Sequence, residues 1–302
     1  DVTASGGTAT ASYPTLKGAF DAINAGTHTN VIQISITGTV TETATASLNA
    51  SGSGSASYTG VTINPVGNAV VTGNLTLPLV ELNGADNVVI DGLNTGGNSL
   101  TISNTNTSAT SRTCTIKLIG DATNNTITNS IIQGSATMST TANGGTIFIS
   151  TAASGGNGND NNTISNNDIG ASPAGTPTKG IYGNGTTTNQ NIANSGINIT
   201  NNNIHDIFLA SGAASFIYVS SGNTQWNISQ NKLYQTTSRA FTGTSSFYYI
   251  YFSNSTYGEG VTIENNKIGY AAADGTGTTT YTGTGASVYG INTTFNSSAS
   301  LP

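Results

Sequence analysis

A short asparagine-rich pattern returns five times in this chain and constrains its fold more than any other feature. An aliphatic residue is followed by a polar residue, by Asn or Gln, usually by a second Asn, by any residue and by another aliphatic. The five copies span residues 126–132, 163–169, 198–204, 227–233 and 262–268. Their first aliphatic residues lie 37, 35, 29 and 35 positions apart, an interval typical of repeat architectures. A unit of this size cannot bury its own apolar face, so we expect the units to stack on one another.

The spacing of the two aliphatic residues predicts a corner between them. They lie five positions apart, so plain alternation along a strand would place them on opposite faces. One residue with positive φ returns both to the inside, and Asn is well suited to that conformation. We therefore expect a corner at the third or fourth residue of the pattern. Stacked corners would align the second Asn of each copy in a structural ladder of amide hydrogen bonds, made of Asn167, Asn202, Asn231 and Asn266 and continued by Ser130.

This pattern resembles the asparagine-ladder turn of right-handed parallel β-helices of the pectate-lyase-like superfamily, over at least residues 80–292. We therefore expect an all-β, right-handed parallel β-helix that forms a single domain over residues 1–302, with stacked coils over residues 31–292. Roughly seven to eight coils at about 4.8 Å each predict a rod on the order of 35–40 Å long. In an early form of the repeat, at residues 88–93, Gly92 stands where the corner Asn is expected, since Gly also adopts positive φ.

The composition fits a solenoid and argues against several classes of function. Only 7% of the residues are charged, against about 25% in ordinary domains. The net charge of −6 argues against nucleic acid as a partner, because no basic stripe could release phosphate counterions. No apolar stretch reaches the length of a membrane span, and the single Cys114 allows no intrachain disulfide. A chain rich in Thr, Ser, Asn and Gly with little Lys favours a secreted protein.

An amphipathic helix is predicted from Pro14 to Ala25, within a cap that spans residues 13–26. Four apolar residues recur at helical spacing and form one face: Leu16, Ala19, Phe20 and Ile23. A β-helix has an open apolar end with unpaired strand edges, so we expect this helix to cover it. Strict alternation then predicts a half-buried strand over residues 31–40, and residues 41–60 read as a long loop.

Residues 13–101 resemble a module that recurs in very large cell-surface proteins of Bacteroidota. The likeness lies in residues 22–28 and 82–93. Such proteins are typically exported by the type IX secretion system and include adhesins, so the resemblance implies surface display and adhesion. The chain ends at Leu301 and Pro302 just after an expected strand, and we expect it to be a fragment that adjoins other domains of a longer parent chain.

A second strand precedes the corner in each coil and carries an aromatic residue at its centre. The flanking residues should face the core, so the central residue should point outward. We call these residues the aromatic column: Phe148, Tyr182, Tyr218, Tyr251 and Tyr289. Glu81 and Lys117 occupy the same position in earlier coils. The rings either stiffen the sheet, lie beneath the loops between coils, contact a protein partner, or form a glycan-binding face, since aromatic rings offer sugars a flat apolar surface and a hydroxyl.

The sequence offers no convincing catalytic or metal-binding set, and we expect no cofactor. Glycoside hydrolases need paired carboxylates at a set separation, and calcium sites need several clustered oxygen ligands. Asp86, Asp121 and Asp160 each precede a repeat by four to six residues and are the best acidic cluster available. His205 and Asp206 are adjacent on an expected strand, so their side chains should point in opposite directions.

These observations predict a structural or adhesive β-helix segment of a secreted bacterial cell-surface protein. Glycans or a surface polysaccharide are the expected partners, bound at the aromatic column, and we expect neither nucleic acid binding nor membrane insertion. The alternative is a polysaccharide lyase or glycoside hydrolase of the same fold.

Overall fold

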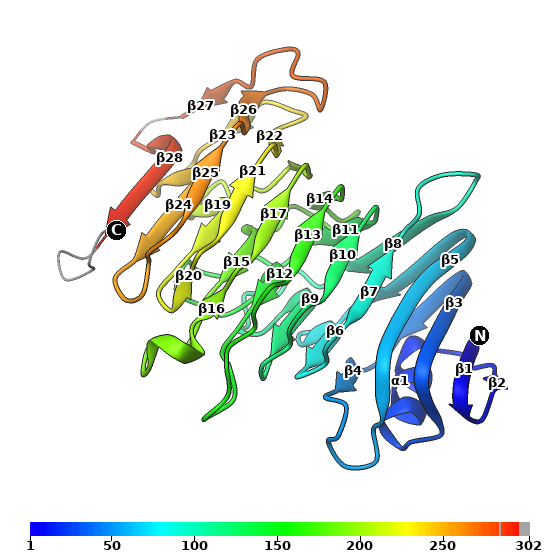
Figure 1. Cartoon of the computed structure of the whole chain (residues 1–302). Helices are drawn as coiled ribbons and strands as arrows, with labels where there is room; N and C mark the ends of the chain where they lie inside the picture. The colour runs from blue at the N-terminus through cyan, green and yellow to red at the C-terminus, as the bar shows by residue number, and fades with distance from the viewer. Residues whose placement is uncertain (284, 296–302) are drawn as a thin grey trace.

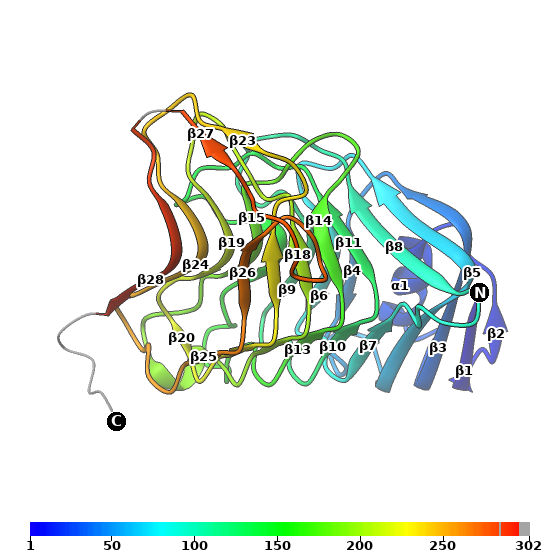
Figure 2. The same cartoon turned by 90° about the horizontal axis from the view of Figure 1, so that it is seen from above.

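The computed structural model describes residues 1–283 and 285–295, and almost all of its regular structure is β-strand. The strands form coils that follow one another from the N-terminal cap to β28 (Val288–Phe295), as Figure 1 and Figure 2 show. The strands of successive coils pair in parallel, so the expected parallel β-helix is confirmed. Leu301 and Pro302, where we expected the fragment to end, lie outside the described residues.

Each coil contributes strands to three faces of the solenoid. The face before the Asn corner contains β7 (Val88–Asp91), β10 (Thr126–Thr128), β13 (Thr163–Ser165), β17 (Asn198–Thr200), β21 (Asn227–Ser229) and β25 (Thr262–Glu264). The face after it contains β8 (Ser99–Asn104), β11 (Ile131–Gly134), β14 (Asp168–Ala171), β18 (Asn203–His205), β22 (Lys232–Tyr234) and β26 (Lys267–Tyr270). A separate eight-stranded sheet contains β4 (Ala46–Asn49), β6 (Pro78–Asn83), β9 (Cys114–Ile119), β12 (Gly145–Ile149), β15 (Lys179–Gly183), β19 (Ala214–Val219), β24 (Phe247–Asn254) and β28.

The repeat aliphatics form the core because they stack directly on one another. Ile127 pairs in register with Ile164, which pairs with Ile199, and Ile199 pairs with Ile228. All four side chains are buried. Burial of an aliphatic side chain contributes about 1.5–3 kcal/mol, so a narrow core of few residues per coil supports a long chain of low hydrophobicity.

The first two coils differ from the others because their strands bend without breaking. β3 (His28–Glu42) and β5 (Tyr58–Gly73) each cover two faces, and β5 pairs with β7 through its first half and with β8 through its second. Gly38 and Gly67 take positive φ at the bends, the role that Asn has in later coils. The expectation of one long loop over residues 41–60 is wrong, because β4 lies within that range and extends the eight-stranded sheet.

The helix α1 (Leu16–Asn24) closes the N-terminal end, and its four expected apolar residues are buried, which confirms the cap. It begins later than expected, because Thr15 is the N-cap and accepts a hydrogen bond from the Gly18 amide at 3.0 Å. Pro14 therefore lies before the helix. Asn24 donates to the Ser47 carbonyl and accepts from the Asn49 amide, at 2.8 and 2.9 Å. These bonds satisfy the edge of β4 that would otherwise be open.

Short elements complete the described chain. β1 (Val2–Gly7) pairs antiparallel with β3 and with β2 (Thr10–Ala11) at the N-terminal edge. Two small parallel sheets join β16 (Asn194–Ser195) to β20 (Asn223–Thr224) and β23 (Arg239–Ala240) to β27 (Tyr281–Thr282). The 3-10 helix η1 spans Gln190–Ile192.

The expected corner at Gly92 is wrong in detail. The left-handed residues there are Leu93, with φ of 59°, and Asn94, with φ of 47°. Leu93 is held in this conformation by a hydrogen bond from its amide to Oδ1 of Asp91 at 2.8 Å. Gly92 is needed for a different reason, since a Cβ at that position would lie 2.2 Å from the carbonyl oxygen of Asn129 in the next coil.

Candidate functional site

The two asparagines of the repeat have different backbone conformations. The first of the pair, or the residue that replaces it, is left-handed in every copy, with φ of 51°, 57°, 57°, 59° and 54° at Asn129, Asn166, Asn201, Gln230 and Asn265. The second Asn does not take positive φ. The sequence left open whether the corner is the third or the fourth residue of the pattern. It is the third, so the ladder residues, which are the fourth, follow the corner and do not form it.

The second Asn of each pair makes amide hydrogen bonds along the axis of the solenoid. Nδ2 of Asn167 donates to Oδ1 of Asn202 at 3.1 Å, and Nδ2 of Asn202 donates to Oδ1 of Asn231 at 3.0 Å. Nδ2 of Asn231 donates in turn to Oδ1 of Asn266 at 3.0 Å. Each Nδ2 also donates to a carbonyl of the preceding coil, as Asn202 does to Ile164 at 2.8 Å. These groups are committed to internal bonds, which leaves them nothing to offer a ligand.

A second buried column of asparagines was missed by the sequence analysis. Nδ2 of Asn159 donates to Oδ1 of Asn194 at 2.8 Å, and Nδ2 of Asn194 donates to Oδ1 of Asn223 at 2.9 Å. All three side chains are fully buried. A signal was present, because each of these residues precedes the first aliphatic of its repeat by five positions. Each of these Asn residues stands further from the aliphatic than the corner pair does, so its periodicity is less evident in the sequence.

The aromatic column exists as a stack of rings, but its first two members are not on the surface. Phe148 and Tyr182 stack at 5.3 Å between ring centroids and are only 1% and 2% exposed. Both rings belong to a cluster apart from the main core, but the hypothesis of an accessible glycan-binding face is wrong at these two positions because they are buried. The loop before β12, which contains Ala142 and Asn143, forms a cover that is hydrogen-bonded to this part of the sheet. Nδ2 of Asn184 donates to Oδ1 of Asn143 in that cover at 2.8 Å.

Lys179 also binds the loop that covers these rings. Its Nζ lies 4.2 Å from the centroid of the Tyr182 ring and donates to the carbonyl of Ala142 at 2.5 Å. The side chain is almost completely buried. Burial lowers the pKa of Lys179 to about 7, because the charged form of the amine loses its hydration there.

The column continues through tyrosines that are partly exposed. Tyr182 stacks on Tyr218 at 4.8 Å, and Tyr218 stacks on Tyr251 at 4.7 Å. Tyr289 does not pair with Tyr251 as expected, because the register of β28 places Asn292 there and Tyr289 beside Tyr248. Its ring still joins the stack, since Tyr248 lies 5.1 Å from Tyr289 and 4.2 Å from Tyr251.

We define the tyrosine patch as the accessible part of this stack: Tyr218, Tyr248, Tyr251 and Tyr289. The first three are half-buried and Tyr289 is 37% exposed. Neighbouring rings are nearly parallel, with interplanar angles of 18°, 11° and 13°. Each interior ring has its faces covered by its neighbours, so the patch presents ring edges and hydroxyl groups to solvent rather than a flat aromatic surface.

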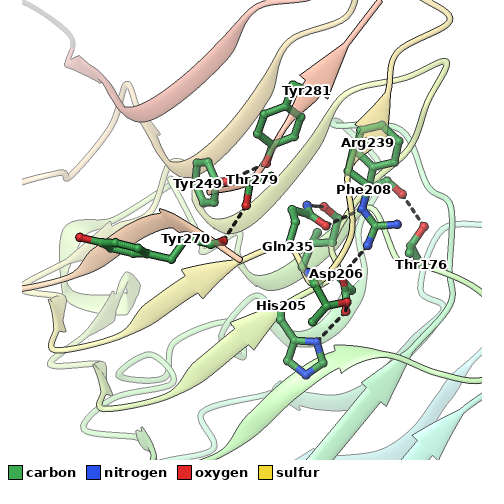
Figure 3. A network of polar contacts seen from close by, with 12 residues as sticks. Thr176, His205, Asp206, Phe208, Gln235, Arg239, Tyr249, Tyr270, Thr279 and Tyr281 are labelled. Atoms are coloured by element: carbon green, nitrogen blue, oxygen red, sulfur yellow. Dashed lines mark hydrogen bonds and ion pairs between the residues drawn. The ribbon is translucent and has the colours of Figure 1, made fainter. Parts of the chain in front are cut away.

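A polar network on the face after the Asn corner is a second candidate, which Figure 3 shows from close by. Nε2 of His205 lies 3.0 Å from Oδ1 of Asp168, and Nδ1 lies 2.9 Å from Oδ2 of Asp206. Arg239 forms an ion pair with Asp206 from the next coil, and the Thr236 hydroxyl donates to Asp206 at 2.8 Å. This network was not predicted from the sequence, because the expectation assumed an extended strand whereas Asp206 has a φ of 55°. The left-handed turn brings its side chain back toward His205, against our expectation that the two point in opposite directions.

The electrostatics of this network favour a permanent ion cluster over acid–base catalysis. Burial alone acts to lower the pKa of His205, but the hydrogen bonds and charges of Asp168 and Asp206 outweigh it and raise the pKa to about 9. Burial acts to raise the pKa of Asp206, but its bonds to His205 and Thr236 lower it to about 2. Both nitrogens of the imidazolium face carboxylates, so no free lone pair is left to serve as a general base.

The three loop aspartates each bind backbone amides of the next coil. Oδ1 of Asp86 accepts from the Thr123 amide at 2.7 Å, and Oδ1 of Asp160 accepts from the Ser195 amide at 2.7 Å. Asp121 accepts from the amides of Ala153 and Gly158 at 3.1 and 3.2 Å. These carboxylates hold loops together along the axis. Across residues 1–283 and 285–295, no three His, Cys, Asp or Glu side chains are grouped to hold a metal ion.

Comparison with known proteins adds little to this geometry. No protein-family model matches the chain, and no curated protein matches it. Among solved structures it is similar to the Streptococcus pneumoniae surface protein and adhesin PfbA, at 13% sequence identity over 93% of each chain and a TM-score of 0.33. The class of protein is thus defined by the fold itself, a parallel β-helix. In the described part of the chain, no helix is long and apolar enough to cross a membrane.

Proposed function

We propose that this chain is a structural and adhesive segment of a secreted bacterial cell-surface protein and that it attaches to glycans through the tyrosine patch. The observation that carries the proposal is the change in solvent exposure along one stack of aromatic rings. Phe148 and Tyr182 are buried, whereas the four tyrosines that follow reach the surface. The accessible end of the stack therefore presents ring edges that carry hydroxyl groups, which can form hydrogen bonds to a ligand.

The exposed edges suit hydrogen bonding to sugar hydroxyls. Between Tyr218 and Tyr251 the ring centroids lie 4.7 Å apart, and between Tyr248 and Tyr289 they lie 5.1 Å apart. The rings of neighbouring strands therefore lie about one strand spacing apart, and a tyrosine hydroxyl can donate one hydrogen bond and accept another. The outermost ring, Tyr289, lacks a second ring neighbour among the described residues and leaves one face for the apolar side of a pyranose.

Removing hydroxyls without removing rings tests this proposal. The variant Tyr218→Phe/Tyr251→Phe/Tyr289→Phe keeps the stack and should lose binding on a glycan array and attachment to glycan-coated surfaces. Tyr182→Phe is the matched control, because it makes the same chemical change in the covered part of the stack and should bind as the unmodified protein does. If the triple variant attaches normally, the stack is a stiffening element and the proposal fails.

Analysis of reaction products distinguishes the enzyme alternative from adhesion. Incubation of the protein with acidic and neutral polysaccharides should release no shortened products, because the imidazole nitrogens of His205 are both occupied by carboxylates. Release of oligosaccharides that stops on His205→Gln would establish the enzyme alternative in place of adhesion.

A further inference from the structure

Over residues 1–283 and 285–295, three of the seven Lys and Arg residues of this acidic chain form ion pairs, and two of those that form none lie side by side. The chain has seven Lys and Arg residues. Among the described residues, ion pairs join Lys17 to Asp21, Lys117 to Glu81 and Arg239 to Asp206, and Lys179 is buried. Arg112 lies alone in a loop. Lys232 and Lys267 form no ion pair in the described part of the chain, yet they are register partners on neighbouring strands.

Both lysines point away from the core on the outer face of β22 and β26. Their neighbours Leu233 and Ile268 are paired in register and belong to the core, so the residues before them face outward. Lys267 is exposed and Lys232 is half-buried. Adjacent strands are about 4.8 Å apart, so two ammonium groups can approach one acidic group together.

Tyr270 adds an aromatic surface to the same face. It lies on β26, in register with Tyr234, and its side chain is 38% exposed. It makes no ring contact with another described aromatic residue, in contrast to the tyrosine patch, whose faces are covered. Figure 3 shows its ring directed away from the His205 network, with only its carbonyl engaged, by the Thr279 hydroxyl at 2.6 Å. Tyr270 therefore offers a partly exposed ring that no other described aromatic ring covers.

We propose that the outer face of β22 and β26 binds a saccharide that carries a negative charge, with Lys232 and Lys267 at its acidic group and Tyr270 against its sugar ring. An ammonium group is a compact charge suited to a carboxylate or sulfate, and an unstacked ring suits the apolar face of a pyranose. A nucleic acid is a poor fit, because two cations neutralise too few phosphates on a chain of net charge −6. The site lies on a different sheet from the tyrosine patch and does not rest on the function proposed above.

Asp274 acts as an internal competitor for this site. It lies in the segment that follows β26, near enough to Lys232 for that charge to contribute to the lowering of its pKa, after the hydrogen bonds from Thr276. A Cβ on the neighbouring Gly275 would lie 3.6 Å from Nζ of Lys267, so this segment borders both lysines. Removing the Asp274 charge should strengthen binding of an acidic saccharide.

Calorimetric titration of the full chain with tri-galacturonic acid, its methyl ester and a sulfated trisaccharide tests the proposal. We expect the acid or the sulfate ester to bind, the uncharged methyl ester to bind at least about tenfold more weakly, and affinity to fall as salt is added. Whichever charged probe binds more tightly identifies the acidic group. Equal binding of the methyl ester, or of inorganic sulfate alone, would overturn the proposal.

Variants locate the binding on the surface. Lys232→Met/Lys267→Met should weaken binding about tenfold or more, Tyr270→Ser should weaken it severalfold, and Asp274→Asn should strengthen it. Lys17→Met is the control, since it removes one positive charge, which pairs with Asp21 on the distant cap helix, and should leave the affinity unchanged. A loss with Lys17→Met as large as with the double variant would show non-specific attraction and reject the site.

Discussion

Asn201 and Asn202 are neighbours in the chain but stabilise the corner in different ways. Asn201 has a φ of 57° and lies at the surface, whereas Asn202 is fully buried and its Oδ1 accepts hydrogen bonds from the amide and side chain of Asn167. One residue therefore supplies backbone conformation and the other supplies hydrogen bonds between coils. Substitutions can separate the two contributions.

At Asn201, we expect the backbone to decide the outcome. Asn201→Val should lower the free energy of unfolding by about 1–2 kcal/mol, because a β-branched residue is strained in the left-handed region. Asn201→Gly should be far milder, since Gly adopts positive φ without strain. Urea denaturation followed by circular dichroism measures both, and equal losses would contradict the role of the backbone.

At Asn202, glycine should give no such relief. Asn202→Val and Asn202→Gly should each cost about 1–3 kcal/mol, because either change leaves the Asn167 amide and the Ile164 carbonyl without their buried partners. Because Asn202 does not take positive φ, Gly has no conformational advantage over Val at this position. A neutral Asn202→Gly variant would show that the ladder bonds are dispensable.

Gly170 makes room for His205, and this close approach gives a third prediction. A Cβ on Gly170 would lie 2.7 Å from Cε1 of His205 and 2.9 Å from its backbone oxygen. Gly170→Ala should therefore destabilise by about 1–3 kcal/mol. Gly290→Ala is the matched control in a strand, because nothing lies within 4 Å of its Cβ position. Thermal unfolding of the two variants should differ clearly.

His205 should make stability fall as the pH becomes alkaline. The pKa of His205 is raised to about 9 by Asp168 and Asp206, from an ordinary value of 6.5. A raised pKa stabilises the fold fully below pH 6.5 and loses that contribution as the pH rises through 9. The difference in unfolding free energy between the protein and His205→Gln should thus shrink between pH 6 and pH 9.5. A difference that stays constant over this pH range would show that the charged form of His205 does not stabilise the fold.

Lys179 should have the opposite dependence on pH. Burial lowers its pKa to about 7 from 10.5, so unfolded chains bind more protons than folded ones between these values. The contribution of Lys179 to the unfolding free energy should therefore rise with pH from about 7 toward 10.5, which the difference between the protein and Lys179→Met measures apart from the effect of His205. Lys179→Met removes the amine while keeping a long apolar side chain and should abolish this rise. If the variant retains the full rise, another group is responsible.

Local periodicity was sufficient to predict most of the architecture. The spacing of Ile127, Ile164, Ile199 and Ile228 predicted which side chains stack in the core, and the face of Leu16, Ala19, Phe20 and Ile23 predicted the cap helix. The spacing of the two aliphatic residues limited the corner to the third or fourth residue of the pattern. Only the backbone φ angles distinguish the two positions, since a left-handed conformation at either Asn would return the chain to the core.

The surface sites depend on contacts that no local pattern encodes. Tyr182 occupies the same position in its coil as Tyr218, yet it is buried, and Lys179 beside it is hydrogen-bonded to Ala142 in a loop distant in sequence. Tyr289 was aligned by its resemblance to earlier triplets, although Ile291 is the residue that pairs with Ile250. Sequence similarity between short strands cannot distinguish a shift of three residues when both registers place an aliphatic residue inward.

The amide ladders also determine how this solenoid would respond to mechanical tension. The bonds of Asn167 to Asn202 and of Asn159 to Asn194 run along the axis, in the same direction as the backbone bonds of the three faces. A pull along the axis would load all of them together at each boundary between coils. Extension would then proceed one coil at a time, in steps of the 29 to 37 residues that separate successive repeats, and each released coil would absorb work before the next one yielded.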